Sequence, residues 1–245
     1  MTYCVAVRVD EGLVMLSDTR TNAGMDNIAR FRKMFTYEVP GDRAIAMMCS
    51  GNLSITQEVK TMLSRAIKDS ADNPDVETLL NCATMHRAAQ IVGDAMQAMQ
   101  SRYRDTIEMQ GAGADASILL AGQRRGGKPR LYLIYSAGNF IEATGDTPFF
   151  QIGEHKYGKP ILDRIIRPAT SIDDAVKAAC VSMDSTLRSN LSVGMPLDLA
   201  VINKDAFAFR VRRRIEPDDE EFAMISQAWA ATLRRGFEDL PNVLD

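Results

Sequence analysis

Residues 2–18 read TYCVAVRVDEGLVMLSD and alternate in the way that half-buried β-strands do. Every second residue from Val5 to Val9 is valine, and residues 10–12 supply turn-forming side chains before a second apolar run. The pattern predicts a β-hairpin that starts at residue 2. Thr2 therefore opens the first strand, and Asp18 ends the second.

Further strands and helices follow this hairpin, with a polar loop at residues 19–30. The sequence predicts strands at residues 33–39, 43–49, 116–123, 130–136, 140–143, 197–202 and 207–215, a short run at 149–152, and helices at 55–67, 76–104, 161–166, 171–187 and 217–238. Strands joined in sequence by short turns form antiparallel sheets, and consecutive helices cover them. We therefore predict a sheet-on-sheet core with helices outside, in a single domain spanning residues 1–245.

The last predicted helix, residues 217–238, carries one apolar face. Phe222, Ile225, Trp229 and Leu233 recur on it at helical spacing. We expect this face to pack on its own subunit. The alternative is that part of it contacts a neighbouring subunit.

Composition excludes several classes of protein. The 245 residues are 46% hydrophobic and 25% charged, which is typical of globular proteins and argues against a disordered or fibrous chain. The net charge of −3 argues against nucleic acid or an anionic membrane as a partner. No apolar run approaches the roughly 18 residues of a membrane span, and no signal peptide is present. We therefore expect a cytoplasmic protein.

Metal, redox and histidine-dependent sites are also disfavoured. The four cysteines lie far apart, at positions 4, 49, 82 and 180, so we expect them to be buried thiols and not zinc or redox pairs. The sequence has two histidines and no G-x-S-x-G motif, which argues against a Ser-His-Asp hydrolase. We predict neither a metal nor a cofactor.

Three further motifs lack the context that their usual function requires. Residues 122–128 match G-x-x-x-x-G-K, but Pro129 replaces the magnesium-binding Ser or Thr, and the segment joins two strands. The glycine-rich residues 111–116 follow a helix and precede a strand, the reverse of a dinucleotide site. The basic run at residues 210–214 is interpreted as the solvated face of a strand, with an acidic partner surface as the alternative.

The beginning of the first strand carries the strongest catalytic signal. Removal of Met1 would give Thr2 a free α-amine with a pKa of about 7.7–8.0, which can accept a proton from the hydroxyl of the same residue. Antiparallel pairing brings Asp18 back toward Thr2, and Lys33, expected to open the third strand, would pair with Asp18. Gly51, at a strand-to-helix corner, could direct its N–H at an oxyanion. Whether the amine or Lys33 accepts the proton stays open.

Four segments carry a resemblance to a known family: TYCVAV at 2–7, SDTRTNAG at 17–24, FRKM at 31–34 and CSGN at 49–52. They resemble the proteasome β-type N-terminal nucleophile hydrolases, and most closely the bacterial branch called Anbu, the ancestral β-subunit. The resemblance implies a four-layer αββα sandwich and a threonine peptidase. It also implies a homo-oligomer, built as a ring or an open spiral, that takes peptide or unfolded polypeptide. Nothing in the sequence identifies an unfoldase partner.

Carried over to this chain, the resemblance makes Thr2 the nucleophile, Asp18 and Lys33 the supporting pair, and Gly51 the oxyanion amide. The chain departs from the family pattern in a stretch between Asp18 and Lys33 that is one residue shorter, and in two further segments that lack expected polar residues. Where the family has a glycine-serine-glycine turn, this chain has glycine, glutamate and histidine at residues 153–155.

The second of these two segments departs from a later pattern of aspartate and serine. Ser189 and Ser192 are the candidate supporting serines there, and no aspartate accompanies them. Two alternatives to a peptidase therefore stay open. One is a self-assembling scaffold with weak or no catalysis, which retention of Met1 would favour. The other is a small-molecule amidase on the same fold.

Overall fold

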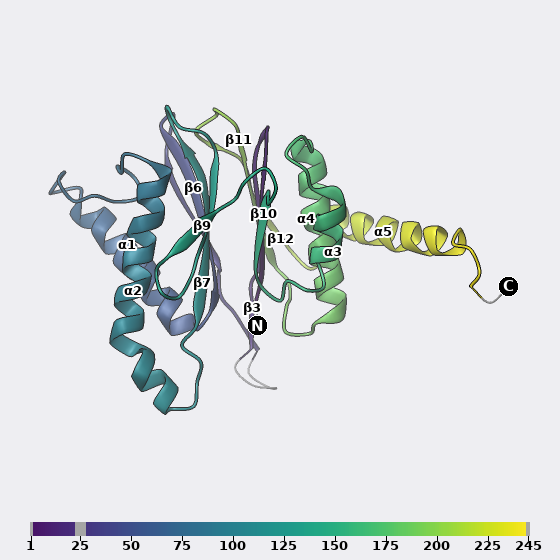
Figure 1. Cartoon of the computed structure of the whole chain (residues 1–245), viewed down its shortest axis with the longest axis horizontal. Helices are drawn as coiled ribbons and strands as arrows, with labels where there is room; N and C mark the ends of the chain where they lie inside the picture. Colours follow the sequence, from purple (N-terminus) through teal and green to yellow (C-terminus); the bar gives the residue numbers. More distant parts are fainter. Residues whose placement is uncertain (1, 23–27, 244–245) are drawn as a thin grey trace.

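Two five-stranded antiparallel sheets form the centre of the protein, for which a computed structural model describes residues 2–22 and 28–243 (Figure 1). The first sheet has the order β10 (Phe149–Gly153), β1 (Tyr3–Val9), β2 (Gly12–Asp18), β11 (Leu197–Asn203) and β12 (Phe209–Ile215). The second has the order β5 (Met34–Val39), β6 (Arg43–Gly51), β7 (Ala116–Arg124), β8 (Arg130–Ile134) and β9 (Phe140–Glu142).

Helices cover the outer faces of both sheets (Figure 1). The second sheet is covered by α1 (Leu53–Asp69) and α2 (Met85–Met109). The first is covered by α3 (Lys159–Ile165) and α4 (Ile172–Ser189), and α5 (Glu220–Glu238) projects from the body beside α4. The four-layer αββα sandwich implied by the resemblance is confirmed.

Strand β1 shows how the sequence produces this layering. Its odd-numbered residues, from Tyr3 onward, belong to the apolar cluster under α3 and α4. Cys4 and Ala6 instead belong to the cluster between the two sheets. Burying each valine of the strand stabilises the fold by on the order of 1.5–3 kcal/mol relative to exposure. The predicted N-terminal hairpin is confirmed, with Cys4 opposite Ser17 in the register.

The second predicted helix differs from the structure in its boundaries. It was expected at residues 76–104, but α2 begins at Met85 and ends at Met109. Thr84 caps the helix by accepting a hydrogen bond from the N–H of Arg87 at 3.0 Å. The preceding residues form turns because the Asn81 amide oxygen accepts from the N–H of Thr78 at 2.6 Å. Side-chain capping therefore competes successfully with helix there.

The segment expected as a polar loop at residues 19–30 contains two short strands, β3 (Arg20–Asn22) and β4 (Ile28–Arg30). They pair antiparallel, and residues 23–27 lie outside the described residues. This hairpin returns the chain to the end of β2, so that Lys33 immediately precedes β5 instead of opening it.

The last helix also begins later than predicted. It was expected from residue 217, but α5 starts at Glu220. The Asp219 carboxylate accepts a hydrogen bond from the N–H of Phe222 at 3.0 Å, which fixes the helix start.

Candidate active site

Asp18 and Lys33 form a buried ion pair at the end of β2. Lys33 Nζ lies 2.6 Å from Asp18 Oδ1 and also donates to the backbone oxygen of Arg20 at 2.6 Å. The Asp18 side chain is 0% exposed, and the Lys33 side chain is 6% exposed. Salt screens such a pair far less than it screens a surface pair. The predicted contact between these residues is therefore present.

Two backbone N–H groups also hold the Asp18 carboxylate. Tyr3 donates to Oδ1 at 3.0 Å, and Gly194 donates to Oδ2 at 3.3 Å. Burial raises the pKa of Asp18 above its ordinary value, while the Lys33 ammonium and the two N–H donors act against that rise. The ionised carboxylate thus depends on Lys33 and on the strand that carries Thr2.

Thr2 is 8% exposed and is fixed through its own backbone and through its neighbour. Its carbonyl oxygen accepts a hydrogen bond from the N–H of Glu154 at 2.7 Å. The Tyr3 hydroxyl lies 2.5 Å from Ser182 Oγ and accepts from the Gln151 side chain at 2.5 Å. Burial raises the pKa of Tyr3 to about 12, so this anchor stays uncharged at neutral pH. Thr2 immediately precedes β1 instead of opening it, and these contacts give it a defined position.

A cleft of about 480 Å³ opens over this residue, and Thr2, Lys33 and Gly51 all line it. Gly51 has φ +95°, and a Cβ there would lie 2.2 Å from the carbonyl oxygen of Asp115, so the position requires glycine. The rest of the wall is mixed in polarity and includes Phe35, Cys49, Leu53, Gln57 and Glu154. A hydroxyl-bearing residue that lines the same cleft as a cation suits attack on a carbonyl carbon.

The structure does not bring the two candidate serines into this cleft. Ser189 is exposed in the last turn of α4, and the N–H of Ser192 donates to the Asn190 side chain at 2.9 Å. Neither belongs to the described residues that line the cleft. Their loop reaches the site through the Gly194 N–H. The pairing of Leu197 with Asp18 in the β11–β2 register places that loop beside the carboxylate.

Residues 153–155, noted in the sequence only for a missing serine, act through the backbone. Gly153 pairs with Tyr3 in the β10–β1 register and has φ +83°. A Cβ on Gly153 would lie 1.9 Å from the carbonyl oxygen of Thr2. The glycine is therefore required for the close approach of β10 to Thr2, the residue that immediately precedes β1.

Replacing Gly153 by alanine is expected to displace Thr2 and to slow its modification by a threonine-directed β-lactone. A shift of about 1 Å in a reacting group can cost about a hundredfold in rate. Gly126→Ala is the matched control. Gly126 also has positive φ, but a Cβ added there would have no other residue within 4 Å. Rates of adduct formation measured by mass spectrometry test this. Equal rates in the two variants would contradict the account.

Other site types find no support in residues 2–22 and 28–243. No group of three or more His, Cys, Asp or Glu residues in these ranges is arranged to hold a metal ion. No helix in the same ranges is long and apolar enough to cross a membrane. All four cysteines are free and buried, as expected.

Comparison with known proteins adds a family and close structural relatives. A family model described as proteasome subunit matches residues 2–202. Anbu (ancestral beta-subunit) from Yersinia bercovieri is 43% identical, with a TM-score of 0.90 over 98% of each chain. An Anbu (Gly-1) mutant from Hyphomicrobium sp. strain MC1 is 45% identical, with a TM-score of 0.90 over 99% of each chain.

A third similar structure is described as a helical assembly of the Anbu complex from Pseudomonas aeruginosa. It is 44% identical, with a TM-score of 0.90 over 98% of this chain and 97% of that chain. No curated protein matches the sequence.

Proposed function

Because this chain belongs to the proteasome subunit family, we propose that it is an N-terminal threonine peptidase that hydrolyses peptide amide bonds. Its nucleophile is the hydroxyl of Thr2, exposed with a free α-amine by removal of Met1. The observation that carries the proposal is the buried Asp18–Lys33 pair. Asp18 accepts a hydrogen bond from the N–H of Tyr3, the residue after Thr2, and Lys33 lines the same cleft as Thr2.

The proposed reaction proceeds through an ester on Thr2. Thr2 Oγ attacks the peptide carbonyl carbon while its proton passes to the α-amine. The positive charge of Lys33 favours the deprotonated hydroxyl, and the N–H of Gly51 donates to the tetrahedral oxyanion. Collapse breaks the C–N bond, and the leaving amine takes the proton. Water then hydrolyses the ester and regenerates the hydroxyl.

Substrate size distinguishes this proposal from its two alternatives. The protein should be offered an unfolded polypeptide and, separately, a simple acyl amide. A peptidase cleaves the polypeptide, whereas cleavage of the simple amide alone would indicate an amidase. Cleavage of neither, together with retention of Met1 in protein from the native host, would indicate a scaffold.

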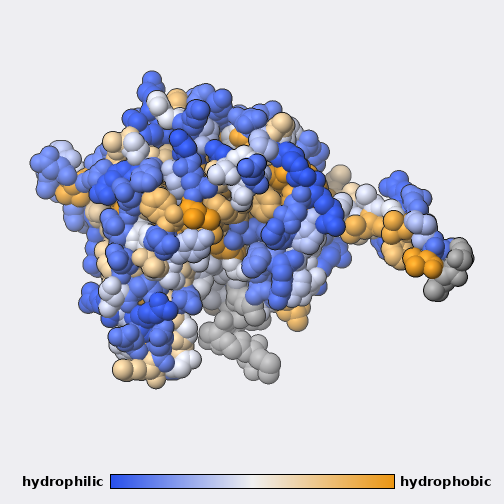
Figure 2. All heavy atoms as spheres, in the orientation of Figure 1, coloured by the Kyte–Doolittle hydropathy of each residue, from blue (hydrophilic) through white to orange (hydrophobic). Residues whose placement is uncertain are grey.

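We further propose that the chain assembles with copies of itself into a ring or an open spiral. The expectation that its apolar face packs on its own subunit holds for the start of α5, where Phe222 is buried and Ile225 packs against the same core cluster, but not for its later turns. Leu233 is 53% exposed and Phe237 is 75% exposed, and orange spheres mark apolar residues along the projecting helix (Figure 2). An exposed apolar stripe of this kind is typical of protein interfaces. It supports the alternative that α5 contacts a neighbouring subunit.

Introducing two aspartates on this stripe, Leu233→Asp with Phe237→Asp, is expected to lower the mass of the assembly. Burying the new carboxylates without partners would be costly. The control, Ala228→Asp with Ala231→Asp, adds the same charge on the opposite face of α5. Light scattering measures the mass of both. An unchanged mass in the stripe variant would exclude the helix from the contact. Both variants keep Phe222, the residue of α5 that is buried in the core.

A further inference from the structure

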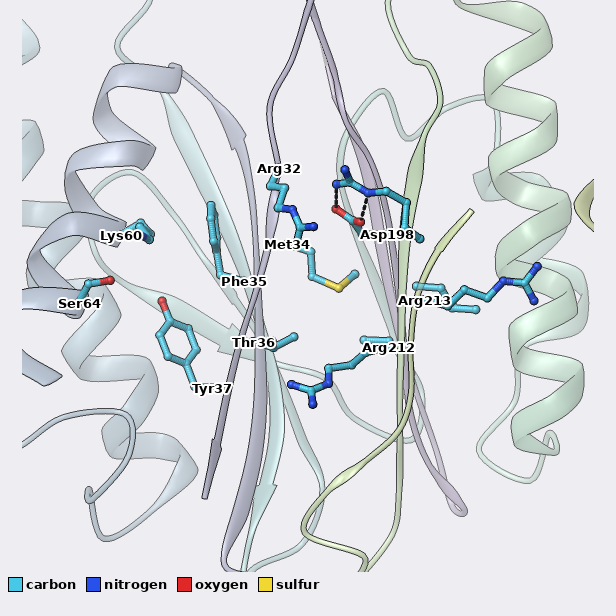
Figure 3. Close-up of a pocket in the computed structure, with 13 residues that line it drawn as sticks. Arg32, Met34, Phe35, Thr36, Tyr37, Lys60, Ser64, Asp198, Arg212 and Arg213 are labelled. Carbon is cyan, nitrogen blue, oxygen red and sulfur yellow. Dashed lines mark hydrogen bonds and ion pairs between the residues drawn. The ribbon is translucent and has the colours of Figure 1, made fainter. Parts of the chain in front are cut away.

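A second cleft, of about 420 Å³, lies at the open edge of the sandwich (Figure 3). Its walls come mainly from β5 and β12, the edge strands of the two sheets, with α1 alongside β5. Arg32 and Phe35 line both this cleft and the cleft at Thr2. The two clefts are therefore adjacent, and a ligand that extends from Thr2 can enter the second one.

Strand alternation directs part of the basic run at residues 210–214 into this cleft. Arg212 pairs with Ala200 in the β11–β12 register, and Ala200 belongs to the cluster between the sheets. Arg212 accordingly points into the space between the edge strands, while Arg213 points away from it (Figure 3). The predicted solvent exposure of the run is present, with Arg212 54% exposed and Arg213 39% exposed, but the arginines lie on both faces of β12 and not on one. The register of β11 and β12 shifts between Val201 and Ile202. Arg210 therefore lies outside the cleft and pairs with Asp173 of α4 at 3.3 Å.

The cations of the cleft outnumber the carboxylates that neutralise them. Arg214 makes two hydrogen bonds to Asp198, and Arg213 pairs with two acidic residues at the start of α5. Among the described residues, Arg212 has one carboxylate partner, Glu38 at 3.3 Å, and also lies over the ring of Phe209. Arg32 and Lys60 form no ion pair with any described residue. A protein with a net charge of −3 thus concentrates unneutralised positive charge in one cleft.

The wall of this cleft also carries an unused hydrogen-bonding group. The hydroxyl of Tyr37 on β5 is buried and has no hydrogen-bond partner. Tyr37 and Ser64 of α1 lie on the side of the cleft next to Lys60 (Figure 3). Buried polar groups normally have partners, so this hydroxyl can accept a hydrogen bond from a water or ligand group that reaches the wall beside Lys60.

We propose that this cleft binds the acidic side chains of an extended polypeptide substrate, several residues away from the bond that Thr2 attacks. The inference rests on the proposed function for the identity of the ligand as a substrate. Carboxylates pair with Arg32, Lys60 and Arg212, and charge-assisted hydrogen bonds of this type are stronger than neutral ones. Within residues 2–22 and 28–243, β5 pairs with β6 alone, so its outer edge is available to the backbone of an extended chain.

Binding of labelled peptides to the full-length protein tests this inference. Fluorescence anisotropy should show that a hexaglutamate peptide binds and that a hexaglutamine peptide of the same length does not. Affinity should fall steeply when salt is raised to about 1 M, where the screening length is about 3 Å. In the Lys60→Gln, Arg212→Gln variant we expect about tenfold weaker binding, because two charge-assisted contacts are lost.

Two matched variants separate loss of charge from loss of structure. Arg210→Gln removes a positive charge from the same strand but outside the cleft, and it should bind the peptide as the unmodified protein does. The charge-retaining variant Lys60→Arg, Arg212→Lys should keep most of the affinity. Equal binding of both peptides, or full affinity in the glutamine variant, would overturn the inference.

The readout does not depend on catalysis. Thr2→Ala should bind hexaglutamate with unchanged affinity. If the unmodified protein begins at Thr2 and binds the acidic peptide but hydrolyses no polypeptide, the peptidase is refuted and the acidic-peptide site is retained. A protein that is labelled at Thr2 and hydrolyses polypeptide but does not bind the acidic peptide would retain the peptidase and refute the acidic-peptide site. Affinity that falls as protein concentration rises would indicate that a second copy of the chain fills the cleft, which contradicts the proposal.

Discussion

Replacing Thr2 by alanine is expected to abolish peptide hydrolysis. Alanine lacks the Oγ atom that forms the acyl ester, yet it is small enough for Met1 removal to proceed and leave a free α-amine. The loss in kcat/KM should be at least about a thousandfold, as for other enzymes that lose their nucleophile. Initial rates on a fluorogenic peptide, with the N-terminus checked by intact-mass spectrometry, measure it.

Thr2→Ser is the matched control for this change. Serine keeps a hydroxyl at the same position beside the same amine, so it should retain measurable hydrolysis. Turnover that is unaffected in Thr2→Ala would show that another residue performs the attack. Equal loss in the serine and alanine variants would indicate that Thr2 has only a structural role.

Replacing Lys33 by methionine is expected to destabilise the fold by about 3–5 kcal/mol at neutral pH, because it leaves the Asp18 carboxylate buried without its counter-ion. Burial already raises the pKa of Asp18, and removal of the ammonium raises it further. A carboxyl whose pKa is raised in the folded state favours folding at low pH and loses that contribution as pH rises through the folded pKa. The variant should therefore regain stability as pH falls toward about 4.

Urea unfolding at a series of pH values measures this effect. The control is the double variant Asp18→Asn, Lys33→Met, which removes both charges and should lose less stability than Lys33→Met at neutral pH. It should also lack the recovery at low pH. A single variant whose stability is independent of pH would contradict the buried, coupled pair.

The sequence was sufficient for the layers of the fold and insufficient for several boundaries. Alternation in residues 2–18 identified the first hairpin because both faces of its strands are buried. The start of α2 was missed by nine residues because the hydrogen bonds of Asn81 and Thr84 form turns in a segment without a helix-breaking proline. The exposure of the later turns of α5 was also unexpected. An apolar stripe has the same residue spacing whether it packs on its own core or on a neighbouring subunit, so the sequence does not distinguish the two.

The candidate site was predictable where side chains act and not where the backbone acts. Asp18 and Lys33 have the charges that an ion pair needs, and the pairing of β1 with β2 alone places Asp18 near Thr2. Gly194 and Glu154 contribute N–H groups, which every residue except proline carries, so their identity gives no signal. The loop of Ser189 and Ser192 was recognised for its hydroxyls, whereas its glycine makes the contact.

The cationic cleft required the structure for a related reason. Five consecutive residues at 210–214 include four arginines, and the sequence assigns them all to one strand. The register shift opposite Val201 changes which of them share a face. Only the pairing therefore separates Arg212, beside β5, from Arg210, beside α4.

The central claim is that Thr2, once it is the first residue, is a nucleophile activated by its own amine and by the Asp18–Lys33 pair. Mass spectrometry of the N-terminal peptide after treatment with a threonine-directed β-lactone tests it most directly. The account predicts a chain that begins at Thr2 and carries one adduct on that residue. A chain that begins at Thr2 and stays unmodified, while its fold is intact, would contradict it.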